Sequence, residues 1–267
     1  MARALPTQTD TSSRLTTVRS EKRNKLSQVK SLLEAGDIDS ARKLLIALKN
    51  SQHTEEEFWC LFSELYSAEG DFDLALEAAE KAYTRNTSSA RTIKLYGEMA
   101  CLNGRFKLAE QLCKKLSLIA GHELEASLLM VRICRMSYRY DQAITEITKL
   151  IEKFPNNIDY RELRAELLMH RSKWKLALRD LNEIEKSKEL KSRTRIYRLK
   201  ARCHLYTHEY HSAVEYASRV LRSFPRDPVA LQIRAKSYKH LGKHAQAKQD
   251  REKGKTIVDD TDIFSGN

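Results

Sequence analysis

Apolar residues recur every three to four positions through most of the chain, and this spacing predicts amphipathic helices. Trp59, Phe62 and Tyr66 fall at i, i+3 and i+7, so they share one helix face. The next helix carries a second apolar stripe, made of Leu74, Ala75, Ala78, Ala79 and Ala82. Because small side chains let two helix axes approach closely, the two stripes predict a pair of packed helices joined by a short turn.

A short sequence motif is repeated along the chain at a nearly constant spacing. Residues 36–41 read GDIDSA, and similar segments begin 34 residues later at Gly70 and again at Gly104. Each copy ends on an alanine, and the seven alanines are Ala41, Ala75, Ala109, Ala143, Ala177, Ala213 and Ala247. A large side chain stands three residues before each one: Ile38, Phe72, Phe106, Tyr140, Trp174, Tyr210 and His244. Glycine at the start of a copy, as in Gly36, can take the left-handed conformation that ends a helix.

A 34-residue period with these residues resembles the tetratricopeptide repeat family. The resemblance implies an all-α fold, a right-handed superhelical solenoid of about seven helix-turn-helix units. We assign the units to residues 22–55, 56–89, 90–123, 124–157, 158–193, 194–227 and 228–261. A hairpin of this kind cannot bury its apolar faces alone, so stacking of neighbouring units supplies the core.

The two ends of the chain differ in composition from the array, which we place at residues 22–257. The polar segment 1–21 predicts a disordered leader, and the alternative for this Arg-, Ser- and Thr-rich stretch is a mitochondrial transit peptide. The acidic C-terminal tail, residues 258–267, combines three aspartates with Ile263 and Phe264. We interpret the tail as a frayed terminus, and the alternative is that it folds back onto the basic repeats as an autoinhibitory ligand.

Positive charge is concentrated in the last two units. The chain carries 48 Lys and Arg against 36 Asp and Glu, a formal charge of +12, which favours acidic partners. The segment from Thr194 to Ile257 alone has a balance of +10. In the tetratricopeptide family the first helix of each unit lines a concave groove, and the resemblance places a basic array in it. We predict that the partner-binding residues are Arg195, Arg198, Arg202 and Tyr206, with secondary contacts from Lys236, Lys239, Arg132 and Arg135.

These features predict a protein-interaction adaptor or scaffold that binds an acidic or extended segment of another protein in the groove. Arginines in a fixed array favour bidentate pairing with carboxylates or phosphates. The alternative function is RNA or ribonucleoprotein binding through the basic C-terminal repeats. A third interpretation is that the charges form an ordinary solvated face.

Chaperone machinery is a partner that the family resemblance implies. Relatives grip the acidic tails of Hsp70 and Hsp90 chaperones through a carboxylate clamp of Lys, Asn and Arg. The clamp needs polar residues at the sixth position of a unit, where this chain has Leu61, Leu95, Leu129, Leu163, Leu199 and Ile233. The standard clamp is therefore absent, and we interpret these residues as helix packing, with an apolar groove as the alternative. Residues 161–169 and 199–206 also resemble repeats of J-domain co-chaperones, but the chain lacks the His-Pro-Asp of a J-domain.

Motifs for catalysis, nucleotide binding and metal binding are missing from the sequence, so we expect neither an enzyme nor a cofactor. His204, His208 and His211 are the nearest approach to a metal site, and we interpret them as polar turn residues. Five cysteines without a C-x-x-C spacing predict free thiols in a reducing compartment. We therefore expect a cytoplasmic protein, with a nuclear location as the alternative. No apolar stretch is long enough to cross a membrane.

Overall fold

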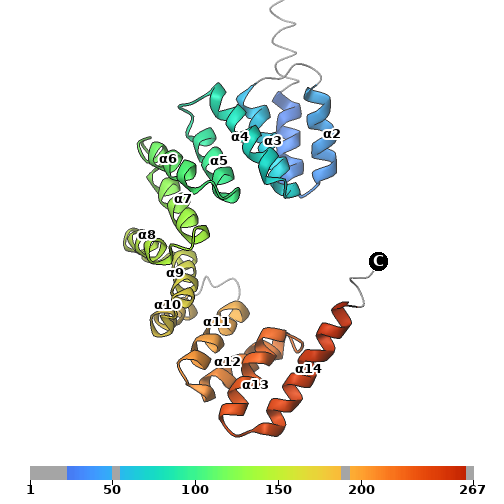
Figure 1. The fold of residues 1–267 in the computed structure, drawn as a ribbon, viewed down its shortest axis with the longest axis vertical. Coiled ribbons are helices and arrows are strands. Elements are labelled where there is room, and N and C mark those ends of the chain that lie inside the picture. The colour runs from blue at the N-terminus through green and yellow to red at the C-terminus, as the bar shows by residue number, and fades with distance from the viewer. Residues whose placement is uncertain (1–22, 50–54, 188–192, 263–267) are drawn as a thin grey trace, which may run out of the picture. The chain divides into compact units, whose positions relative to one another are not determined.

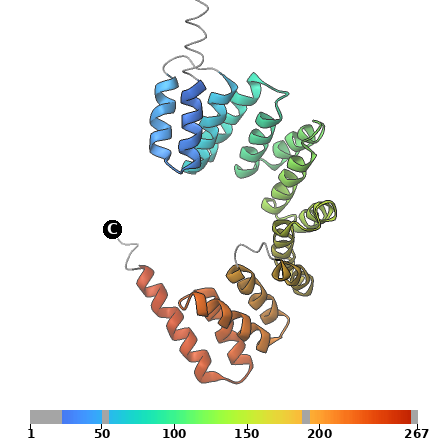
Figure 2. The same cartoon turned by 180° about the vertical axis from the view of Figure 1, so that it is seen from behind.

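The computed structural model describes residues 23–49, 55–187 and 193–262, with side chains described as far as Gly254. All regular structure within these ranges is helical, which confirms the predicted all-α fold of helical hairpins (Figures 1 and 2). The leader at 1–21 lies outside the described residues. The helix that begins at His244 extends to Asp262, whereas residues 263–267 and the side chains of the acidic tail lie outside the description.

The helices belong to two compact units, Met1–Ser137 and Tyr138–Asn267. The N-terminal unit contains a helix at residues 23–34, followed by α2 (Ile38–Lys49), α3 (Glu56–Glu69), α4 (Phe72–Arg85), α5 (Ala90–Leu102), α6 (Phe106–Ser117) and α7 (Glu123–Met136). The C-terminal unit contains α8 (Tyr140–Lys153), α9 (Ile158–His170), α10 (Trp174–Lys186), α11 (Arg193–Tyr206), α12 (Tyr210–Ser223), α13 (Pro228–His240) and α14 (His244–Asp262). Consecutive helices pack as antiparallel pairs, as α3 with α4 and α11 with α12 show in Figure 1.

The repeated alanine lies in the second helix of every sequence unit and is enclosed in each case. Six of the seven are 0% exposed and Ala247 is 3% exposed. Around them the N-terminal unit builds its core from residues such as Phe58, Leu65 and Ile93. The C-terminal unit uses Leu181 and Val220 in the same way. The alanine period seen in the sequence is therefore the period of the helix contacts.

Two expectations about apolar residues have different outcomes. Leu74 was expected in the buried stripe of α4, but it is 39% exposed, and Leu76 is buried instead. Successive helical residues are turned by about 100°, so Leu74 and Leu76 lie on opposite sides of Ala75, and only the side of Leu76 is covered by the core. At the sixth position of the units, Leu61, Leu95, Leu129 and Ile233 are buried, which confirms helix packing there, while Leu163 and Leu199 are half-buried.

The turn inside each hairpin uses a residue in the left-handed conformation. Gly36, Gly70, Gly104 and Gly242 have φ between 73° and 83°, as expected from their place in the repeat. The other three units have a residue with a side chain at this position, namely Tyr138, Ser172 and His208, with φ of 60°, 55° and 64°. This conformation costs such a residue about 1–2 kcal/mol relative to its relaxed state. These three turns are therefore strained.

Replacing Ser172 by glycine is expected to stabilise the protein. Relief of the strain exceeds the freedom that glycine adds to the unfolded chain, about 0.4–1 kcal/mol, so we expect a net gain of about 0.5–1 kcal/mol in the free energy of unfolding. Urea unfolding followed by circular dichroism measures the change. Ser172→Ala is the matched control, because it keeps a Cβ and leaves the strain in place. A glycine variant no more stable than the alanine variant would show that this turn stores no strain.

Candidate functional site

The residues predicted to bind a partner lie on first helices of the hairpins. Arg195, Arg198, Arg202 and Tyr206 are on α11, and Lys236 and Lys239 are on α13, which packs directly against α11. The structure therefore brings these six residues onto two adjacent helices. Arg132 and Arg135 are on α7 in the N-terminal unit.

Two of the three α11 arginines predicted to bind a partner are neutralised within the protein. The Nε of Arg195 lies 2.6 Å from Oε1 of Glu162, and its Nη2 lies 2.7 Å from Oε1 of Glu166. The hydrogen bond to Glu166 raises the pKa of Arg195 above its usual value, and burial raises the pKa of Glu162. Arg198 pairs with Asp227, the residue that caps the start of α13. These two arginines connect neighbouring helices.

Three of the predicted cations on these two helices have no counter-ion among the described residues. Arg202, Lys236 and Lys239 are exposed, and none of them has an ion pair with any residue in the described ranges. Tyr206, one helical turn after Arg202, is 45% exposed. Apart from Arg193 at the start of α11, which is also exposed and unpaired among the described residues, the unpaired positive charge of these two helices is on Arg202 and α13.

The N-terminal unit also uses arginines to connect its first helices. Arg91 on α5 lies 3.7 Å from Glu57 and 3.8 Å from Glu64 on α3. Arg132 on α7 lies 3.7 Å from Glu98 on α5. Arg135 is exposed and has no ion pair among the residues described.

Stacked rings follow one edge of the C-terminal unit at a regular position in the repeat. The pairs are Tyr140 with His170, Trp174 with Tyr206, and Tyr210 with His240, with centroid distances of 4.8, 4.4 and 4.4 Å and interplanar angles of 12° or less. In each pair the ring on the first helix is exposed, and the ring that begins the preceding second helix is half-buried behind it. Each exposed ring therefore has a rigid apolar support.

A small pocket opens between α9 and α11, beside the open cations, and we call it the α9–α11 pocket. Its volume is about 280 Å³, and it is lined by Glu166, Met169, His170, Trp174, Leu199 and Arg202. Met169 is buried, and Leu199 and Trp174 are half-buried. Met169, Leu199 and Trp174 therefore give the pocket an apolar part. The rest of its lining is polar and consists of His170, a carboxylate already paired with Arg195, and the unpaired guanidinium of Arg202.

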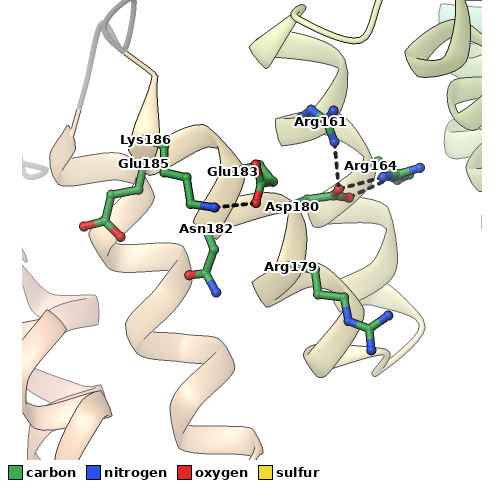
Figure 3. A pocket seen from close by; sticks show the side chains of 8 residues that line it. All are labelled: Arg161, Arg164, Arg179, Asp180, Asn182, Glu183, Glu185 and Lys186. Carbon is green, nitrogen blue, oxygen red and sulfur yellow. Dashed lines mark hydrogen bonds and ion pairs between the residues drawn. The ribbon is translucent and has the colours of Figure 1, made fainter.

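A larger hollow of about 700 Å³, between α9 and α10, is polar and satisfied by its own charges (Figure 3). Arg164 donates two hydrogen bonds to Asp180, from Nε at 2.8 Å and from Nη2 at 2.6 Å, and Arg161 approaches the same carboxylate at 3.8 Å. Lys186 pairs with Glu183 at 2.8 Å. Because its deepest ions saturate one another, this hollow offers little to a ligand.

The Arg164–Asp180 pair is one of a set of buried polar contacts that recur at equivalent positions. Arg234 donates two hydrogen bonds of 2.7 Å to Asp250 and one of 3.1 Å to Ser218 on the preceding helix α12. Arg164 likewise reaches Thr148 on α8 at 3.2 Å. In the α11–α12 hairpin between them, the equivalent residue is Lys200, which is 3% exposed. Its Nζ pairs with Glu185 of the preceding hairpin and lies 2.8 Å from the Tyr216 hydroxyl. Sequence reasoning missed this set, although its signal was visible as a basic residue seven positions into three successive units.

The histidines and cysteines considered for chemistry have structural roles. His204 lies 2.9 Å from Glu209 and stacks on Tyr216, and His208 contacts the Tyr210 hydroxyl. All five cysteines are buried free thiols, and burial raises the pKa of Cys60 and of Cys203 to about 12. Among the described residues no group of His, Cys, Asp or Glu could hold a metal ion, and nothing there points to catalysis.

The hairpins, their alanine contacts and the turn residues define a helical repeat protein of the tetratricopeptide class. Residues 100–167 match the tetratricopeptide repeat family. Residues 100–167 therefore contain tetratricopeptide repeat sequence, and the described helices share the fold of solved tetratricopeptide structures. None of the described helices is long and apolar enough to serve as a membrane span.

Solved structures of low sequence identity share the fold. PilW, a widely conserved type IV pilus biogenesis factor, gives a TM-score of 0.70 at 16% identity over 78% of this chain and 96% of its own. PilF of Pseudomonas aeruginosa gives 0.63 at 17% identity, over 81% and 98% of the two chains. YrrB, a tetratricopeptide protein with an unusual peptide-binding site, gives 0.50 at 14% identity, over 70% and 95%. The chain has no match among curated protein sequences.

Removing one partner of the buried Arg164–Asp180 pair is expected to destabilise the protein strongly. Arg164→Leu leaves the Asp180 side chain, which is 5% exposed, without its main counter-ion, and we expect a loss of about 3–5 kcal/mol in the free energy of unfolding. Chemical denaturation of the full chain measures it. The double variant Arg164→Leu/Asp180→Leu is expected to recover much of the loss, because no buried charge remains. Equal losses in the single and double variants would show that packing, and not charge, holds this position.

The cysteine thiols are expected to resist alkylation in the folded protein. Burial and a raised pKa keep Cys60 and Cys203 protonated at pH 8, so iodoacetamide labels them only after unfolding in guanidinium chloride, as mass spectrometry would show. The same shift makes the folded state less stable in alkali. As the pH rises from about 8.5 towards 12, the unfolded chain loses thiol protons first, and stability falls. Labelling of either thiol at the unfolded rate in the native protein would contradict this.

Proposed function

We propose that this protein is an interaction adaptor that holds an acidic, extended segment of a partner protein on α11 and α13. The observation that carries the proposal is the set of three exposed cations, Arg202, Lys236 and Lys239, that the protein leaves without counter-ions while it pairs Arg195 and Arg198 internally. A carboxylate-rich segment supplies the missing charges.

The arrangement of these cations supports a segment that lies across the two helices. Lys236 and Lys239 are three residues apart and share one face of α13, and Arg202 is on the adjacent helix. Arg202 can bind a carboxylate through two parallel hydrogen bonds. Tyr206, supported from behind by Trp174, adds an exposed apolar surface beside it. In this proposal Arg195 and Arg198 position α11.

The class of fold and the cysteines are consistent with this role. YrrB, which shares the fold, has a peptide-binding site by its description, and that use of the fold supports peptide binding here. Five free, buried thiols favour a reducing compartment such as the cytoplasm. A co-chaperone-like scaffold is one setting that fits, without the standard carboxylate clamp.

Fluorescence anisotropy with a labelled glutamate-rich peptide tests the proposal. We expect Arg202→Glu/Lys236→Glu/Lys239→Glu to bind about 10–100-fold more weakly than the parent, a loss of about 1.4–2.7 kcal/mol. The matched control is Lys175→Glu/Arg179→Glu/Arg222→Glu. It makes the same change in net charge at exposed positions of α10 and α12, and it should bind like the parent.

A labelled uridine-rich RNA, titrated at several salt concentrations, serves as the competing probe. RNA binding through phosphates falls steeply with salt and depends little on which basic surface is changed. If both triple variants lost affinity equally, or if only the RNA bound, the acidic-segment function would be rejected.

A further inference from the structure

The α9–α11 pocket lies where the stack of first helices is locally widened. α11 and α13 pack directly on one another, whereas α9 and α11 approach each other less closely. The repeat also lengthens here, since Ala177 and Ala213 are 36 residues apart in place of 34. Arg195 spans the gap through its ion pairs with Glu162 and Glu166, so the helices stay connected while a space remains between them.

The chemistry of the pocket points to an apolar occupant. Met169, Leu199 and Trp174 supply the apolar half of its lining, and the Trp174 ring is held in place by its stack with Tyr206. Glu166 at the rim is already paired with Arg195, so it is no longer available to a basic side chain. Arg202, on the other side, is the rim charge left open. An uncharged side chain fits beside the paired Glu166, and an acidic residue next to it in the partner sequence can pair with Arg202.

The size of the pocket limits the occupant to a single side chain. Sites for small molecules usually measure about 300–1,000 Å³, and this pocket, at about 280 Å³, is smaller. It has room for one phenylalanine, leucine or methionine side chain that enters from a chain lying across α11.

We infer that the partner segment carries one large apolar residue that anchors in the α9–α11 pocket, beside acidic residues that pair with Arg202, Lys236 and Lys239. This inference rests on the proposed function, and it adds a specificity pocket to it. The partner's recognition element is then an acidic sequence interrupted by one aromatic or long aliphatic side chain. An acidic sequence without such a residue keeps the charge contacts and loses the anchor.

The two tryptophans of the chain allow a direct test, because Trp174 is in the wall of the pocket and Trp59 is in the N-terminal unit. In the full-length Trp59→Phe protein, Trp174 is the sole tryptophan and reports on the pocket by its emission. The probes are glutamate-rich peptides that are identical except for one central residue, which is Phe, Leu, Ala or Lys. We expect the Phe and Leu probes to bind about 10–100-fold more tightly than the Ala probe. We also expect them alone to change the Trp174 emission.

A pocket-filling variant gives the second readout. Leu199→Phe is expected to remove the preference for the Phe probe over the Ala probe. Leu176→Phe is the matched control, since Leu176 is an exposed leucine on α10, 44% accessible and outside the pocket, and this variant should keep the preference. Circular dichroism verifies that both variants fold. The comparison of the four probes in the Trp59→Phe protein does not depend on these variants.

The outcomes separate the two proposals. Equal affinity for all acidic probes with an unchanged Trp174 emission would overturn the anchor pocket and leave the acidic-segment function intact. Failure of every acidic probe to bind would overturn the function itself. Tightest binding of the Lys probe would show that Glu166, and not Arg202, governs the pocket, and it would also overturn the inference.

Discussion

The architecture depends on a contact between backbones that only a very small side chain permits. At the crossing point in the second helix of each unit the chain places an alanine, and all seven are enclosed. A larger residue there would separate the helices and open voids along the core, because protein interiors are packed close to the density of organic crystals. The bulky residue three positions earlier, such as Phe106 or Trp174, fills the space beside the turn. The helix spacing set by these alanines determines which side chains of successive first helices can reach one another.

The spacing between first helices decides which basic side chains of the C-terminal unit form ion pairs within the protein. Arg195 and Arg202 are two turns apart on one helix face, yet Arg195 meets two carboxylates of α9 and Arg202 meets none among the described residues. A surface ion pair contributes little to stability by itself, but it removes a cation from the set available to a partner. The binding surface is therefore defined as much by the pairs that the protein makes internally as by its net charge.

The fold could be predicted from the sequence because its determinants are periodic and local. Gly36, Gly70 and the seven alanines indicate the turns and contacts without knowledge of distant residues. The exposure of Leu74 could not be predicted in the same way, because Leu74 and Leu76 flank Ala75 symmetrically and only the packing of the core decides which of them is covered. For the site, the sequence indicated the right helices but could not separate Arg195 and Arg198 from Arg202, since pairing with Glu162, Glu166 and Asp227 depends on the spacing of helices 29 to 33 residues apart in sequence. The α9–α11 pocket was missed for the same reason.

The buried polar contacts have a consequence for how the hairpins are ordered. By their alanines alone the hairpins look interchangeable, but Arg234 needs the hydroxyl of Ser218 from the hairpin before it, and Lys200 needs Glu185 from its own predecessor. Excising the α11–α12 hairpin would remove Lys200 and bring Glu185 next to α13. Arg234 on α13 could not replace Lys200, because it already pairs with Asp250. Each junction thus recognises its neighbour, and the C-terminal unit is a fixed sequence of non-equivalent modules that cannot be shuffled or shortened at will.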